Sequence, residues 1–200
     1  LKNIAEDIIL KDIVPRYNIK NSSQIRDMFF YIVSNATNTV NYSTLSNKLG
    51  IDAKTVKDYI TYFEDNFLIS QISNYHNKLS EQIKSAKKIY LNDNGFLNLS
   101  ISSNRNFGVS LENLVFNFLY EKDENLTYLK DKYEIDFFSN KSLYQVTFNI
   151  DDENTKKREL NAFGYFDSLD TSQKILVTYD INEQYEDVEV ISCDNFILLK

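Results

Sequence analysis

The sequence predicts an α+β protein of two domains, an N-terminal helical domain with a winged helix–turn–helix and a C-terminal α/β domain with a mixed sheet. Two observations support this fold class. Apolar residues recur at helical spacing through most of the first 65 residues, whereas the second half reads in order as helix, three strands, helix and two strands, with "NFILLK" at the end. A polar turn and loop, "NDNGFLNLSISSNRNFG", separates the two patterns. We therefore expect domains at residues 1–100 and 101–200.

Composition excludes several classes of protein. The 200 residues are 42% hydrophobic with four Gly and one Pro, which is enough for real cores and favours regular secondary structure. The single Cys193 excludes an internal disulfide and a multi-cysteine zinc site and fits a reducing, cytoplasmic location. No apolar stretch approaches the roughly 20 residues that span a bilayer, so we expect no membrane partner. No signal peptide is visible, and the first residue is Leu, so we expect a piece of a longer chain.

Charge is unevenly distributed between the halves. Residues 1–100 hold 12 Lys/Arg and 10 Asp/Glu, whereas residues 101–200 hold 10 and 19. The net charges are therefore +2 and −9. Nucleic acid would prefer the first half, because phosphates are repelled by an acidic surface.

The N-terminal segment predicts helices. An apolar stripe runs to Val14, and Pro15 bends or ends that helix. Ser22 or Ser23 can cap the next helix, which carries an apolar face. The two stripes are Ile4, Ile8, Ile9, Ile13 and Val14, and then Ile25, Met28, Phe29, Ile32 and Val33.

A helix–turn–helix follows. Ser43 can cap a short helix that stops at Gly50, and Asp52 can cap a second helix over about residues 53–65. "FLISQIS" and "KKIYLND" are expected to form the two strands of a wing. The buried face of the second helix is expected to be Val56, Tyr59, Ile60 and Phe63.

Outward-facing residues of this motif could contact DNA. Lysines and threonines suit phosphates and guanine edges, although the outward Asp58 weakens the case. Winged helices also mediate protein contacts, so DNA and protein partners both stay open. The candidates are Lys54, Thr55, Lys57 and Thr61 on the second helix and Lys78, Lys84, Lys87 and Lys88 in the wing.

"LKDIVPRYNI", then the winged helix, "KKIYLNDNGF", "LENLVFNFLY", "EIDF" and "YQVTF" occur in this order. This succession resembles the C-terminal region of a prokaryotic, archaeal and bacterial AAA+-type ATPase family. Its members join a P-loop ATPase module to a winged helix and a restriction-endonuclease-like, PD-(D/E)XK-like domain. The chain lacks G-x-x-x-x-G-K-[S/T], so the resemblance implies no ATPase activity here and a P-loop module elsewhere in the same longer chain.

The resemblance also implies a magnesium-dependent nuclease site. In that fold one helix acid and two strand acids hold Mg²⁺, and a lysine orients the attacking water. The matching positions here are Glu112, Asp136 and Gln145, which would be the metal ligands. Thr147 stands where the lysine is expected. The closest substitutes are Lys156 and Lys157 on the following helix and Lys130 on the preceding strand, and Lys156 is the candidate replacement. The site is thus degenerate, and catalysis stays uncertain.

Structural explanations compete with each functional one. Asp136 between Ile135 and Phe137 could simply face solvent, and Gln145 could be an ordinary sheet residue. Glu112 in an apolar helix needs a partner, which favours a functional role. Lone His76 cannot build a zinc site. The open alternatives for the whole chain are a non-catalytic interaction or assembly module of the ATPase, which could form a homo-oligomer, and a DNA-binding transcription regulator.

Overall fold

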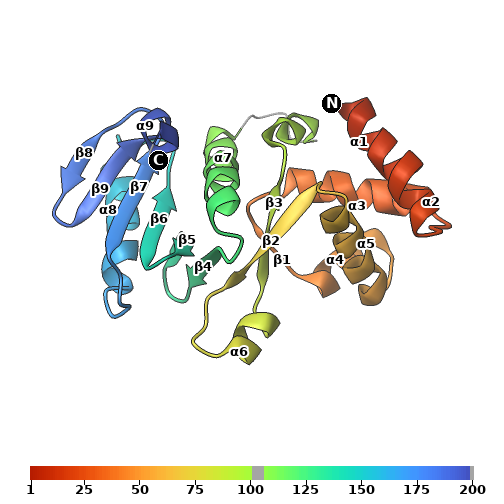
Figure 1. Ribbon diagram of the computed structural model, residues 1–200, viewed down its shortest axis with the longest axis horizontal. Coiled ribbons are helices and arrows are strands. Elements are labelled where there is room, and N and C mark those ends of the chain that lie inside the picture. Colours follow the sequence, from red (N-terminus) through yellow and green to blue (C-terminus); the bar gives the residue numbers. More distant parts are fainter. Residues whose placement is uncertain (101–105, 199–200) are drawn as a thin grey trace. The chain divides into compact units, whose positions relative to one another are not determined.

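The computed structural model describes residues 1–100 and 106–198 and divides the chain into two compact units (Figure 1). Unit 1 comprises Leu1–Gln71 and Ala86–Arg105, and unit 2 comprises Ile72–Ser85 and Asn106–Lys200. The sequence places one boundary near residue 100, whereas the structure also groups residues 72–85 with unit 2. The reason is a strand pairing: Ser73 and Asn74 lie parallel to Thr127 and Tyr128 of the second unit.

Unit 1 begins with a helical run that Pro15 does not end. α1 (Lys2–Asp7) continues into a wider π-helical segment, η1 (Ile8–Ile13), and then α2 (Val14–Arg16). Proline lacks the N–H that an α-helix would use and its ring presses on the preceding turn, so a widened turn before Pro15 lets the chain continue. α3 (Ser22–Ser34) follows, and its cap is Asn21, which accepts the Gln24 N–H, rather than either predicted serine.

The remaining elements of unit 1 form a helix–turn–helix beside short strands. β1 (Thr39–Val40) precedes α4 (Tyr42–Leu49) and α5 (Ala53–Asp65), and Gly50 joins the helices with a left-handed φ of 64°. Asp52 caps α5 as predicted, but Asn41 rather than Ser43 caps α4. The predicted face of α5 (Val56, Tyr59, Ile60 and Phe63) is buried.

Two longer strands complete the sheet of unit 1. β2 (Ile69–Asn74) and β3 (Lys87–Leu91) lie in the order β1-β3-β2, and β1 pairs antiparallel with β3. The 3-10 helix η2 (Asn94–Leu99) follows β3, and its Phe96 packs edge-on against Phe29 of α3. The connection from β2 to β3 carries the short helix α6 (Leu79–Lys84), which belongs to unit 2.

Unit 2 is a mixed sheet with helices, which confirms the predicted α/β character. The strands run β2-β4-β5-β6-β7-β9-β8, where β4–β5, β5–β6 and β8–β9 are antiparallel and β2–β4, β6–β7 and β7–β9 are parallel. The new elements are α7 (Phe107–Lys122), β4 (Thr127–Lys130), β5 (Glu134–Ser139), β6 (Ser142–Val146), α8 (Glu153–Tyr165), β7 (Gln173–Thr178), β8 (Glu183–Tyr185), β9 (Val188–Ser192) and α9 (Cys193–Leu198).

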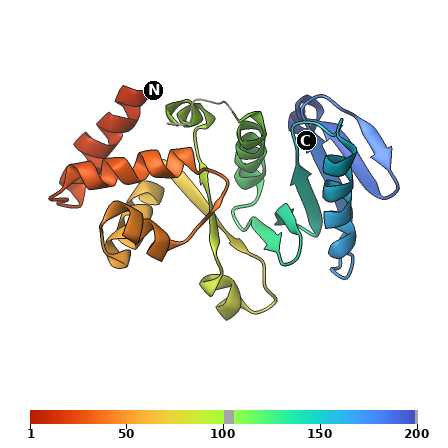
Figure 2. The ribbon, with the colours of Figure 1, turned by 180° about the vertical axis from the view of Figure 1, so that it is seen from behind.

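Helices cover both faces of this sheet. Leu143 and Tyr144 are consecutive on β6 and therefore face opposite sides. Leu143 belongs to an apolar core with Ala162 and Phe163 of α8, which lies along the sheet in Figure 2. Tyr144 instead packs against Phe196 of α9, which also contacts α7. In the described part of the chain, no helix is long and apolar enough to cross a membrane.

Candidate functional site

A register shift on β5 determines where Asp136 points. Leu129 of β4 lies opposite Ile135, but Thr127 lies opposite Phe138, so β5 carries one extra residue across this stretch. Such irregularities bend a strand and redirect a side chain, and they are common beside active sites. The simple alternation that would let Asp136 face solvent is therefore broken, and Asp136 is only 7% exposed.

Next to this shift, side-chain oxygens accept the backbone N–H groups that regular β5–β6 pairing would otherwise bind. The regular pairing ends at Phe137 opposite Tyr144, one position before Asp136 and Gln145. There, the Asp136 N–H donates to the Gln145 Oε1 at 3.0 Å, and the Val146 N–H donates to the Asp136 Oδ2 at 2.9 Å. The two residues that the sequence places together are thus adjacent, and each satisfies a backbone group of the facing strand.

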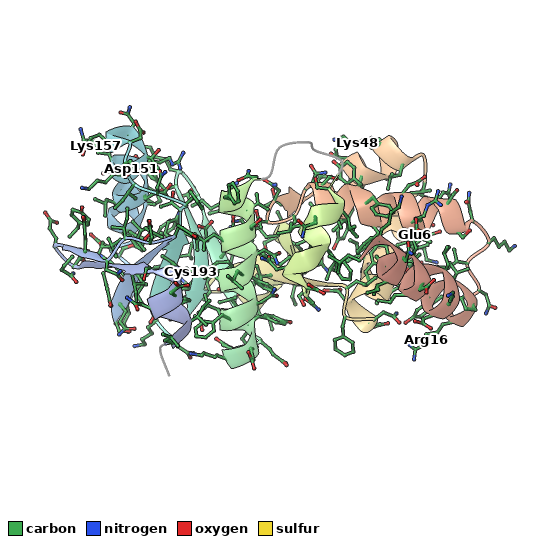
Figure 3. All side chains as sticks on the ribbon, turned by 90° about the horizontal axis from the view of Figure 1, so that it is seen from above. Glu6, Arg16, Lys48, Asp151, Lys157 and Cys193 are labelled. Carbon is green, nitrogen blue, oxygen red and sulfur yellow. The ribbon has the colours of Figure 1, made fainter. Side chains whose placement is uncertain are left out.

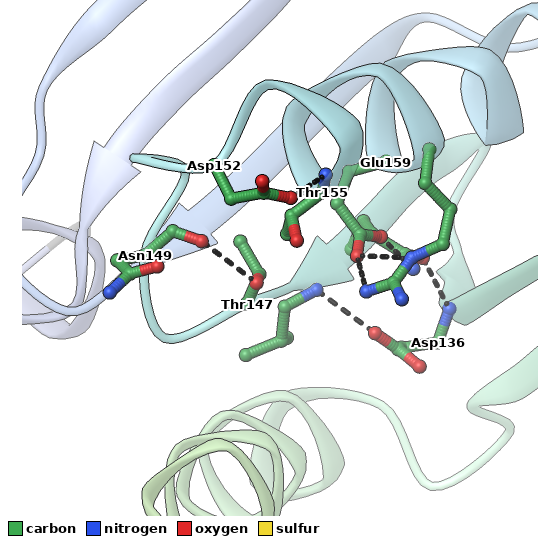
Figure 4. A network of polar contacts seen from close by, with 9 residues as sticks. Asp136, Thr147, Asn149, Asp152, Thr155 and Glu159 are labelled. Carbon is green, nitrogen blue, oxygen red and sulfur yellow. Dashed lines mark hydrogen bonds and ion pairs between the residues drawn. The ribbon is translucent and has the colours of Figure 1, made fainter.

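Helix α8 adds a buried acid and a cation. The Gln145 Nε2 donates to the Glu159 Oε2 at 2.7 Å, and the Arg158 Nε donates to the Glu159 Oε1 at 3.1 Å (Figure 4). Glu159 is 3% exposed, so its charge needs these partners. The hydrogen bond from Arg158 to Glu159, with the added charges of Glu159 and Asp136, raises the pKa of the guanidinium. We call Asp136, Gln145, Arg158 and Glu159 the polar network.

Sequence reasoning missed Arg158 and Glu159. The missed signal was local: Glu159, Ala162 and Phe163 share one helical face, and the latter two belong to the apolar core. A carboxylate on such a stripe must be paired. The partner could not be predicted, because Gln145 comes from a strand 14 residues away along the chain.

Two of the candidate lysines, Lys156 and Lys130, make their contacts with residues outside the polar network. The Lys156 Nζ donates to the Tyr185 hydroxyl at 2.7 Å and lies 4.1 Å from the centroid of that ring. Lys130 pairs with Glu134 at 2.6 Å. Thr147 donates its hydroxyl to the Asn149 carbonyl at 3.2 Å (Figure 4). The cation that interacts with the charge of Asp136 is Arg158, which follows the predicted Lys156 by two residues on α8.

Glu112, the third predicted ligand, is half-buried in the second turn of α7. Among residues 1–100 and 106–198, no three His, Cys, Asp or Glu side chains gather in a way that could hold a metal ion. Asp136 Oδ2, Gln145 Oε1 and both carboxylate oxygens of Glu159 accept hydrogen bonds from protein N–H groups. These oxygens are hard ligands of the kind that Mg²⁺ prefers, and each of them already accepts a hydrogen bond within the protein.

In unit 1, most of the predicted contact residues of α5 are accessible. Lys54, Lys57 and Thr61 are exposed, and Thr61 donates to the Lys57 carbonyl. Thr55 is half-buried, because its N–H and hydroxyl both bond to the capping Asp52. These hydrogen bonds from Thr55 lower the pKa of Asp52.

The predicted wing lysines differ in exposure. Lys88 is 3% exposed, so it does not offer its ammonium to a ligand, in contrast to the expectation. Lys87 is half-buried, and burial lowers its pKa. In unit 2, Lys84 and Lys78 are exposed, and Lys78 pairs with Glu81 at 3.4 Å. Of the four predicted wing lysines, these two are the exposed ones.

Comparison with known proteins places the chain in a family. The family model described as "Domain of unknown function (DUF8612)" matches residues 1–106. The chain belongs to this family. An uncharacterized protein of Methanocaldococcus jannaschii is 31% identical over 213 residues, which cover 98% of this chain and 47% of that protein. An uncharacterized protein of Haemophilus influenzae is 29% identical over 211 residues, which cover 99% and 52%.

The chain thus spans about half the length of these two curated relatives. No solved structure matches it. The DUF8612 match ends at Asn106, the N-cap of α7, so it includes the helix–turn–helix and excludes the entire polar network. Similarity to the relatives extends across both regions.

Proposed function

We propose that this DUF8612 chain is the C-terminal part of an AAA+-type ATPase that engages DNA through unit 1. The supporting order is α3-β1-α4-α5-β2-β3 with the strands arranged β1-β3-β2, the arrangement of a winged helix. Relatives about twice as long as the chain leave room for an ATPase module.

The exposed side of α5 carries the proposal. In a helix–turn–helix the second helix enters the major groove and its outward side chains meet bases and phosphates. Lys54, Lys57 and Thr61 occupy that side and are exposed. Two lysines give a modest positive surface, so affinity is expected to be low and to fall steeply with salt.

Duplex DNA binding, measured by anisotropy at several NaCl concentrations, tests the proposal. The variant Lys54→Ala/Lys57→Ala is expected to bind more weakly and to reduce the slope of log K against log[salt] by about 1.8, since each phosphate contact contributes about 0.9. The matched control Lys11→Ala/Lys20→Ala removes the same charge elsewhere in unit 1. Equal losses in both variants, or no binding by the wild type, would reject α5 as the DNA-contacting element.

For unit 2 we propose a restriction-endonuclease-like domain that does not cleave. Its helix–three strands–helix order and the position of Asp136 and Gln145 support the fold assignment. The polar network supports the loss of activity, because main-chain N–H groups already donate to two oxygens of the predicted ligands, the Asp136 Oδ2 and the Gln145 Oε1. The role left to unit 2 is binding or assembly.

A cleavage assay tests this second point. We expect no cutting of single-stranded, duplex or branched DNA with Mg²⁺ or Mn²⁺ at low salt. Metal-dependent cutting that disappears in both Glu112→Ala and Asp136→Ala would overturn the proposal and make unit 2 a working nuclease. Glu159→Gln in the same assay would then show whether α8 supplies the missing acid.

A further inference from the structure

Three aromatic rings from distant parts of unit 2 stack on one another. Phe107 begins α7, Phe148 follows β6, and Tyr179 follows β7. The ring centroids of Phe107 and Phe148 are 5.4 Å apart with planes at 30°, and those of Phe148 and Tyr179 are 5.0 Å apart at 21°. We call these three residues the aromatic ladder. Phe148 is its middle ring.

The ladder is a surface feature rather than part of a core. Phe107 and Tyr179 are each 57% exposed, although each has one face against Phe148. Single exposed apolar side chains are common, but here exposed rings stack into one contiguous apolar patch, the kind of surface that marks an interaction site. The contiguity of these rings therefore marks a surface that another group can cover.

The backbone holds the ladder in place. The Tyr179 N–H donates to the Phe148 carbonyl at 3.1 Å, and the Thr147 N–H donates to the Val177 carbonyl at 3.0 Å. These bonds extend the parallel β6–β7 pairing past the ends of both strands. A ligand would thus meet rings that are already ordered, with little further loss of conformational entropy.

Charge around the ladder selects the kind of ligand. Asp180 follows Tyr179 directly, Asp151 lies three residues after Phe148 and two before α8 begins (Figure 3), and both are exposed. The second half of the chain carries a net charge of −9. Ring faces attract cations, and nearby carboxylates strengthen that attraction. The same surface disfavours the phosphates of nucleic acid.

Unit 2 uses this chemistry internally as well. Lys122 lies 4.0 Å from the ring centroid of Phe118, and Lys156 lies 4.1 Å from that of Tyr185. Among the described residues, the only ring contacts of Phe107 and Tyr179 are with Phe148. A cation for the ladder would therefore come from another molecule or segment.

We propose that the aromatic ladder is a docking platform for an arginine side chain on a basic segment of a protein partner. Arginine fits better than lysine, because its planar guanidinium stacks on a ring and can still donate to a carboxylate. Asp151 and Asp180 would accept those hydrogen bonds. This inference stands independently of DNA binding by α5.

Titration with labelled peptides tests the docking platform. The probes are a six-residue arginine peptide, the matching lysine peptide and a single-stranded oligonucleotide, each followed by anisotropy. The wild type is expected to bind the arginine peptide most tightly. Phe107→Leu/Tyr179→Leu keeps apolar bulk, removes both outer rings and is expected to weaken that binding about fivefold. Phe67→Leu, which removes a still more exposed ring in unit 1, should leave it unchanged.

Three results would overturn the inference. The ladder variant could bind the arginine peptide as well as the wild type. The lysine peptide could bind equally tightly, which would reduce the effect to net charge. The oligonucleotide could bind in a ladder-dependent way while the arginine peptide does not, which would make the surface a nucleic-acid platform. Lys54→Ala/Lys57→Ala is expected to leave peptide binding unchanged, so failure here and failure of DNA binding by α5 are distinguishable.

Discussion

Gln145 donates its side-chain amide to the buried carboxylate of Glu159 across 2.7 Å, and its carbonyl oxygen accepts the Asp136 N–H at 3.0 Å. An amide meets both demands, because one end donates and the other accepts. A carboxylate at position 145 could meet only the second. The Gln that breaks the nuclease pattern is therefore the residue that the packed polar network requires.

Gln145→Glu is expected to destabilise unit 2. The change would place two carboxylates in contact inside a buried site, which raises the pKa of one of them. We expect the free energy of unfolding at pH 7 to fall by about 1–3 kcal/mol. Since an acid with a raised pKa is protonated first, the loss should shrink as the pH is lowered toward 4. Chemical denaturation at pH 4.5 and pH 7 measures both effects.

Gln173→Glu is the control for this substitution. The Gln173 Oε1 accepts a hydrogen bond from the Ser142 hydroxyl, and the residue is exposed, so a carboxylate can replace the amide without losing a donor. It should change stability little at either pH. Equal losses at positions 145 and 173, or a Gln145→Glu effect that does not depend on pH, would contradict the account of the polar network.

Two glycines are expected to respond to alanine with opposite signs. Gly50 has φ +64°, and no atom lies within 4 Å of the point where a Cβ would stand, so only the backbone conformation opposes a side chain. Gly50→Ala should lower the free energy of unfolding by about 1 kcal/mol. Gly164 lies within α8 with equally open surroundings, so Gly164→Ala should raise it by about 0.5–1 kcal/mol. Urea denaturation of both variants checks the pair, and a shared sign would refute it.

Local patterns account for most of unit 1. The apolar stripes that predict α3 and the buried face of α5 depend only on spacing within one helix, and they match the buried residues. The predicted caps of α3 and α4 are wrong by one or two residues, since Asn and Ser satisfy the same N–H groups and both lie near each helix start.

Properties that depend on a second element could not be predicted in this way. Asp136 is redirected by a register shift that exists only because β4 pairs with β5. Glu159 meets Gln145 only once α8 packs on the sheet. Lys88 is buried, although its neighbours in the sequence suggest a solvent-facing basic run. In each case the pairing between elements, rather than residue type, decides the environment.

Phe67 is expected to lower the free energy of unfolding of unit 1 relative to a glycine at the same position. It adopts φ +55° at the end of α5, where glycine is usual, and it is 80% exposed. The neighbouring Leu68 N–H donates to the Phe63 carbonyl at 2.9 Å, which closes the helix end. Phe67→Gly should keep that bond, relieve the left-handed conformation and raise the free energy of unfolding by about 0.5–1 kcal/mol. Phe67→Leu keeps the conformational cost and should not; thermal denaturation that ranks Leu above Gly would contradict this reasoning.

Lys174 ties two loops of unit 2 together. Its ammonium donates to both Asp167, after α8, and Asp187, in the β8–β9 turn, while its own side chain is only 12% exposed. Lys174→Met keeps the buried stem and removes the charge. We expect it to lower the free energy of unfolding by about 1 kcal/mol, because both carboxylates are largely exposed and solvent weakens such pairs.

The dependence of this loss on pH follows from Asp187. The hydrogen bond from Lys174 lowers the pKa of the Asp187 carboxyl, against a smaller opposing effect of burial. Its contribution is therefore complete above the unfolded-state pKa of about 3.9 and is lost as the pH falls through the lower folded value. The difference between wild type and Lys174→Met should accordingly be constant from pH 5 to pH 7 and shrink below about pH 4.

Asp187→Asn should reproduce that pH dependence. Adding Lys174→Met to Asp187→Asn should lower the free energy of unfolding by less than Lys174→Met does in the wild type. A difference that stays constant down to pH 2.5 would mean that Lys174 acts through packing alone.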